Sequence, residues 1–132
     1  MFSHICVGTN DFNRAQRFYT AVLEILGLEL YINDPDKPWA IWREPGVARP
    51  LFIVGGPFDG HPAASGNGQM VAFAAVDRKT VDRCHATAMA HGAQNEGSPA
   101  LRPHYHAQYY GTYFRDPDGN KLCVVCHHKE EP

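Results

Sequence analysis

The sequence has no long apolar run and no amino-terminal stretch in which basic residues precede an apolar segment. A membrane-spanning helix needs roughly 18 or more consecutive apolar residues, so we expect no membrane partner. The chain also lacks a large excess of either charge: the twelve Lys and Arg residues are scattered and the net charge is -2. Nucleic-acid binding needs a clustered basic face, so that partner is not expected either. The missing secretory pattern predicts a cytoplasmic protein.

Cysteine is sparse, with only Cys6, Cys84, Cys123 and Cys126 in the chain. In the cytoplasm these four are expected to be reduced thiols rather than a disulfide framework. Cys123 and Cys126 form a C-x-x-C pattern inside an apolar stretch that reads as a strand. Residues three apart on a strand point to opposite faces, so this pair is not expected to bind one ion.

The chain contains an internal repeat, which predicts two structural modules. Residues 4–27 and 70–92 each combine a short apolar strand, an acidic residue, a helix-like run and a closing glycine. Each half later reaches an aromatic-Arg-acid-Pro corner, at 42–45 and at 114–117. With 132 residues the repeat fits one domain, which we divide into module one (1–56), a linker (57–68), module two (69–128) and a frayed tail (129–132).

Local patterns give the elements of each module. Helices are expected after Asn10 or Asp11 and after Asp77, because Asn and Asp cap helix starts, and Gly27 and Gly92 close them. Residues 94–100 read as a short strand or a loop, and 104–114 as an extended aromatic stretch. The other strands are expected at 3–8, 28–32, 39–42, 51–54, 70–75 and 121–126. The expected fold is α+β, with two βαβββ modules.

Strand alternation predicts which side chains face the helices. Ile5 and Val7 should face the first helix, which leaves His4 and Cys6 on the opposite face. On the last strand, Leu122, Val124 and Cys126 should pack toward the helix, and Cys123 and Val125 away from it. We expect Trp39 and Trp42 to share a face of their strand.

The chain resembles the vicinal oxygen chelate superfamily, which includes glyoxalase I, bleomycin-resistance proteins and extradiol dioxygenases. The resemblance covers about residues 3–127. It rests on His4 ahead of the 10–12 Asn-Asp-Phe and 17–19 Arg-Phe-Tyr segments, and on Phe-Arg-Asp-Pro-Asp-Gly-Asn-Lys at 114–121. It implies a curved, cup-shaped mixed sheet with one helix outside each module, a small-molecule ligand in the cup, and a homodimer.

The resemblance also implies four metal-ligand positions, which a glyoxalase I fills with two His and two Glu. Here they fall on His4, near Phe52, and on Met70 and Cys123. Only His4 matches, and divalent ions of this kind need several nitrogen or oxygen donors. We therefore expect no cofactor, and no ordinary metal-dependent glyoxalase I activity; a bound divalent metal is the less favoured alternative.

Other side chains could serve a reworked site. His104 and His106, with His4, are candidate general acid/base residues near neutral pH; the alternative is a solvent-exposed His-Tyr-His loop. Aromatic and sulfur-bearing side chains could line the ligand pocket, although some of them could serve only in packing. The pocket candidates are Cys6, Trp39, Phe52, Met70, Tyr109, Tyr110, Tyr113 and Cys123.

Three functions follow. The favoured one is a glyoxalase/bleomycin-resistance-like enzyme that binds a small organic molecule in the inter-module cup, with a degenerate metal site and an undetermined, lyase-like or related reaction. The first alternative is a non-catalytic protein that sequesters a drug or metabolite. The second is a metal-dependent lyase or dioxygenase with an unusual ligand set.

Overall fold

The computed structural model describes residues 1–34 and 36–130, which form two βαβββ modules. Module one contains β1 (His4–Gly8), α1 (Phe12–Ile25), β2 (Glu29–Asp34), β3 (Trp39–Arg43) and β4 (Leu51–Gly55). Module two contains β5 (Val71–Ala74), α2 (Arg78–Ala90), β6 (Gln94–Leu101), β7 (Tyr110–Arg115) and β8 (Lys121–Cys126). The α+β class and the duplicated module are confirmed.

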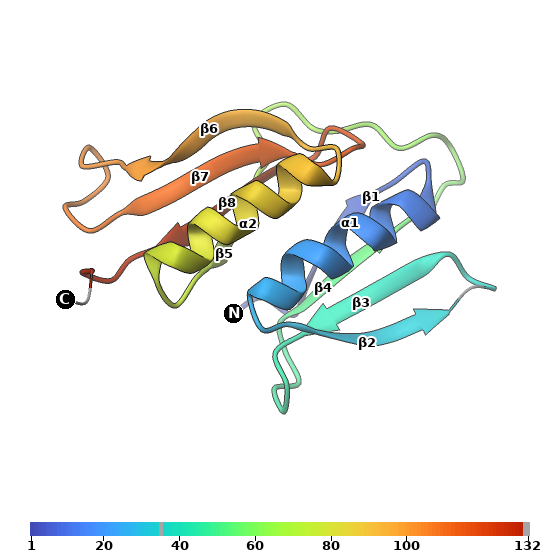
Figure 1. The fold of residues 1–132 in the computed structure, drawn as a ribbon. Helices are drawn as coiled ribbons and strands as arrows, with labels where there is room; N and C mark the ends of the chain where they lie inside the picture. Colours follow the sequence, from blue (N-terminus) through green and yellow to red (C-terminus); the bar gives the residue numbers. More distant parts are fainter. Residues whose placement is uncertain (35, 131–132) are drawn as a thin grey trace.

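Each module folds into a four-stranded mixed sheet, in the order β1-β4-β3-β2 for module one and β5-β8-β7-β6 for module two. The β1–β4 and β5–β8 pairs are parallel, and the other pairs are antiparallel. Figure 1 shows both helices on one side of the two curved sheets, with α1 beside α2 and the linker crossing from β4 to β5. The opposite side of each sheet is called its open face below.

The helices begin where the sequence predicts. Asp11 accepts a hydrogen bond from the Arg14 amide, and Asp77 accepts one from the Thr80 amide. Each cap satisfies one of the amides that a helix start leaves without a partner. Gly27 follows α1 with a φ of 78°, a left-handed backbone that glycine adopts without strain.

The core lies between the sheets and the helices. Ile5, Val7, Phe52 and Val54 all pack into it, as neighbours in the parallel β1–β4 register. Leu122, Val124 and Cys126 do the same in module two. His4, Cys6 and Ile53 therefore point to the open face of module one, and Cys123 to that of module two, because side chains alternate along a strand.

Hydrogen bonds lock the corner of module two onto module one. Asp118 accepts from the Thr9 hydroxyl at 2.6 Å, from the Asn10 amide at 3.0 Å and from Arg14 at 3.1 Å. The buried Asp116 accepts from the Tyr19 hydroxyl on α1. Buried polar groups need such partners, so these contacts fix how the two halves meet.

Several expectations need correction. Trp39 and Trp42 do not share a face: three positions separate them, so Trp42 is buried in the core and Trp39 is 41% exposed. Residues 94–100, read as a short strand or loop, belong to the eight-residue strand β6. Residues 104–109 are not extended but form a turn, in which the Tyr105 amide donates to the Arg102 carbonyl. The tail prediction falls partly on residues 131–132, which lie outside the described residues.

Among the described residues, no helix is both long and apolar enough to cross a membrane.

Candidate functional site

A cavity of about 740 Å³ lies beside the open face of module one, between β1, β3 and β4, the linker, and the first residues of β5 and β8 of module two. We call it the module-one cavity, because most of its lining comes from module one and the linker. Cys6 lines it from β1, Trp39 from β3 and Ile53 from β4. The linker and the residue that follows it supply one wall, which includes Pro57, Phe58, Ala63, Ala64, Gly66 and Gln69. Small-molecule sites are typically concave, mostly apolar and of this size.

The linker is held against β1 by hydrogen bonds. The Asn10 side chain donates to the Ala63 carbonyl at 3.0 Å and accepts from the Ala63 amide at 2.7 Å. Gly8 allows this approach, because a Cβ there would lie 3.0 Å from the Cβ of Ala63. The wall of the cavity is therefore fixed by specific contacts with module one.

Few of the residues that line the cavity have polar side chains. They are Cys6, Gln69, Asn120 and Lys121. Among the described residues that line it, Lys121 alone carries a charge. Asn120 is fixed in place, because its side-chain amide donates to the Gly8 carbonyl at 2.9 Å. The lining is thus mostly apolar and includes a few polar side chains.

The open face of module two is covered by tyrosines. The Tyr109 hydroxyl lies 2.8 Å from the Tyr113 hydroxyl and 3.5 Å from the Cys123 sulfur. Tyr109 belongs to the β6–β7 loop (102–109), which folds back beside Cys123. Burial is the main cause that raises the pKa of Tyr109, Tyr113 and Cys123 above their ordinary values. At neutral pH these groups are protonated donors rather than nucleophiles.

The candidate histidines do not converge. His4 is exposed on β1, where Nδ1 lies 2.9 Å from the Ser3 hydroxyl. His104 packs on the ring of Tyr105, with centroids 4.2 Å apart. The His106 Nε2 atom lies 2.8 Å from the Nδ1 atom of His127. None of the three catalytic candidates lines the module-one cavity.

The pocket candidates separate into three groups. Cys6, Trp39 and Met70 line the cavity, and Tyr109, Tyr113 and Cys123 form the covered cluster of module two. Phe52 and Tyr110 need correction, because both turn toward the helices. Phe52 packs with Tyr19 and Phe73 beside a smaller cavity of about 250 Å³, and the Tyr110 hydroxyl donates to Asp82 of α2 at 2.6 Å.

The positions that correspond to glyoxalase I ligands are now defined. Ile53, not Phe52, faces the open side of β4, so the set reads His4, Ile53, Met70 and Cys123. One imidazole, one thioether and one thiol do not fit a divalent ion that prefers imidazole and carboxylate. Within residues 1–34 and 36–130, no three His, Cys, Asp or Glu side chains are grouped to hold a metal ion.

Lys121, Gln69, Asn120 and Ile53 were not among the predicted site residues. Lys121 had a readable signal, since it lies two positions before Cys123 and must share its face of β8. Gln69 and Asn120 belong to a linker end and a turn, whose position relative to β1 depends on tertiary contacts. Ile53 depends on the register between β1 and β4.

The duplicated βαβββ fold with its cavity on a curved sheet defines a class of protein, and the chain belongs to it: the Glyoxalase/Bleomycin resistance protein/Dioxygenase superfamily, whose family model matches residues 1–124. The chain is similar to the crystal structure of a glyoxalase/bleomycin resistance protein from Albidiferax ferrireducens T118. The two are 35% identical with a TM-score of 0.85, over 96% of this chain and 98% of the other.

More distant structures share the fold. A glyoxalase-related enzyme from Fulvimarina pelagi is 18% identical with a TM-score of 0.72, over 96% of this chain and 87% of the other. A lactoylglutathione lyase from Agrobacterium tumefaciens is 22% identical with a TM-score of 0.64, over 96% and 92%. No curated protein matches the chain.

Proposed function

We propose that the protein binds a small organic molecule in the module-one cavity, and that it does so without a metal ion in the glyoxalase I position. The observation that carries this proposal is the cavity itself: about 740 Å³, mostly apolar in lining, with a few polar side chains among the lining residues. Burial of an apolar ligand against Trp39, Ile53 and Met70 would provide the free energy of binding.

Binding without chemistry is favoured over catalysis. General acid/base catalysis needs a titratable group within hydrogen-bond reach of the reacting proton. The histidines predicted for that role lie outside the cavity lining, and the tyrosine–cysteine cluster of module two faces the β6–β7 loop. Sequestration of a drug or metabolite, as in bleomycin resistance, requires only the apolar hollow.

Catalysis in the same cavity is the second candidate, and one observation favours it. Cys6 and Lys121 both belong to the cavity lining. A thiol is a potential nucleophile, and an ammonium group can stabilise developing negative charge. Substrate turnover that is lost in both Cys6→Ala and Lys121→Met would favour this candidate over simple binding.

Binding can be tested with N-phenyl-1-naphthylamine, a neutral dye that fluoresces in apolar sites. We expect saturable binding to the wild-type protein and at least tenfold weaker binding to Ile53→Asp, because a carboxylate on the cavity floor is costly to desolvate. Leu101→Asp is the matched control, since Leu101 is 46% exposed on β6 and away from the cavity. Equal affinity of all three proteins would contradict the proposal.

We also propose that two copies associate, as the family resemblance implies. Support comes from the edge strand β2, on which Leu30 and Ile32 are 39% and 40% exposed. Exposed apolar edge strands favour association with another chain. Size-exclusion chromatography with light scattering should give a dimer mass, and Ile32→Lys should shift it toward the monomer.

A further inference from the structure

The positive charge of Lys121 in the cavity wall indicates which class of ligand the cavity would favour. Lys121 lies at the start of β8, in the cavity wall next to Asn120. Among the described lining residues there is no Asp or Glu that could pair with it. The chain as a whole carries a net charge of -2. The positive charge in the cavity wall therefore does not follow from an excess of basic residues in the chain.

A second cation, Arg102, lies near the same tyrosine as Lys121. The Lys121 ammonium lies 5.7 Å from the centroid of the Tyr113 ring, and the Arg102 guanidinium lies 5.5 Å from the same centroid. Cation–π contacts at exposed sites are weak, on the order of 1 kcal/mol, so one ring shared by two cations neutralises neither.

Within residues 1–34 and 36–130, no carboxylate forms an ion pair with Lys121 or Arg102. Arg115, the cross-strand partner of Lys121, has its own partner in Glu96, with the Nε and Oε1 atoms 2.7 Å apart. Glu96 is therefore already engaged. The ion pairs of the described residues use Arg14, Arg43, Arg78 and Arg115 as their cations, and neither Lys121 nor Arg102.

We propose that the ligand is an organic anion, in which an apolar body lies against Trp39 and Ile53 and a carboxylate or phosphate group meets Lys121. This inference rests on the proposed function, because it names the ligand class of the same cavity. A lysine in the wall of a mostly apolar hollow, with no acidic residue in the same wall, favours a ligand of opposite charge. A neutral ligand would leave that charge uncompensated on binding.

A matched series of naphthalenes tests the inference, with the neutral dye as the reporter. We expect 2-naphthoate and 2-naphthyl phosphate to displace the dye at about tenfold lower concentration than neutral 2-naphthamide, as is typical of one charge-assisted hydrogen bond. In Lys121→Met the anions and the amide should displace the dye at equal concentrations. Lys121→Arg should retain the advantage of the anions, which should shrink as salt is added.

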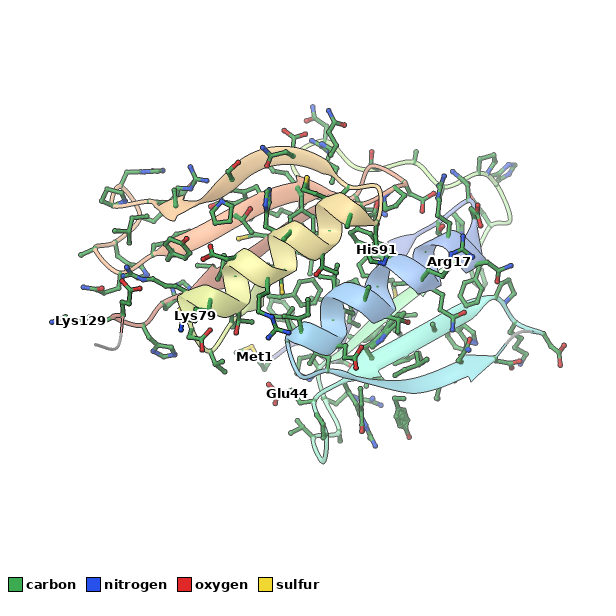
Figure 2. All side chains as sticks on the ribbon, in the orientation of Figure 1. Met1, Arg17, Glu44, Lys79, His91 and Lys129 are labelled. Atoms are coloured by element: carbon green, nitrogen blue, oxygen red, sulfur yellow. The ribbon has the colours of Figure 1, made fainter. Side chains whose placement is uncertain are left out.

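The control variant is Lys79→Met, which removes the same charge from the surface. Figure 2 shows Lys79 at the start of α2, on the helix side of the molecule, so the anion advantage should be unchanged there. Equal potency of amide and anions in the wild type, or an advantage that survives in Lys121→Met, would overturn the inference. Failure of the dye to respond to Ile53→Asp would instead overturn the binding site itself. The ratio of the concentrations at which 2-naphthoate and 2-naphthyl phosphate displace the dye shows whether the cavity prefers a carboxylate or a phosphate.

Discussion

The two modules share a fold but use their open faces differently. In module one, Ile53 of β4 pairs with Cys6 of β1 and lines a cavity. In module two, the equivalent residue is Cys123 of β8, which is fully buried beneath Tyr109. The loops account for the difference. β2 ends at Asp34 and β3 begins at Trp39, whereas residues 102–109 connect β6 to β7. In a duplicated sheet, one open face can therefore keep a cavity while a loop fills the other.

The corners of the two modules also differ. Glu44 in module one is exposed, and Asp116 at the matching position in module two is buried under Tyr19. Besides Tyr19, the Asp116 carboxylate accepts from the Asn120 side chain and from the amides of Asp118 and Asn120, each at 2.9 Å. The two corners are thus similar in sequence but differ in role, because among the described residues only the corner of module two is hydrogen-bonded to the other module.

The largest effect is expected from Asp116→Ala. It removes the acceptor of several buried donors, and unsatisfied buried groups cost about 1–3 kcal/mol each, so we expect a loss of about 3 kcal/mol or more. The free energy of unfolding can be measured by urea titration. The matched control Glu44→Ala, labelled at its exposed site in Figure 2, should change stability by less than about 0.5 kcal/mol. Similar losses in both variants would remove the distinction between the corners.

A smaller, local effect is expected from Tyr109→Ala. In the wild type, Cys6 is exposed and the other three cysteines are buried, so brief treatment with iodoacetamide should modify Cys6 alone. Loss of the Tyr109 ring should expose Cys123 as a second site. Because burial raises the pKa of this thiol, it should react faster as the pH rises. Mass spectrometry of digested protein identifies the modified residues.

The control for this experiment is Tyr31→Ala in module one. Tyr31 is 44% exposed on β2 and packs on Arg43, with the guanidinium 3.7 Å from the ring centroid. Its removal should leave the pattern of modified cysteines unchanged. If Cys123 of the wild type were modified as fast as Cys6, the β6–β7 loop would not cover module two.

Much of the fold could be read from local patterns. Asp11 and Gly27 delimit the first helix because capping and left-handed turns depend on a few neighbouring residues. The strand alternation of 4–7 and 122–126 was predicted correctly for the same reason. Gly97 and Pro99 weakened the signal for β6, whose pairing with β7 also contains register shifts; bulges of this kind do not follow a simple period.

The candidate site was less accessible to such reasoning. Phe52 and Ile53 are both apolar, and only the long-range pairing of β4 with β1 decides which one faces the cavity. The segment from His104 to His106 looked extended because it is aromatic, but the Arg102 amide donates to the Tyr109 carbonyl and closes the loop. The linker was interpreted as a simple connection. Its place in the cavity wall depends on contacts of Ala63 with Asn10 and Gly8, which are distant in the sequence.

The linker between the modules also determines the dimensions of the cavity. Its residues Pro57, Ala63 and Gly66 form part of one wall, while both sheets are complete without them. Surface connections tolerate changes in length better than the elements that they join. Lengthening, shortening or replacing this segment would thus change the size and shape of the cavity and leave the two open sheets intact, which makes it the natural place to engineer the cavity.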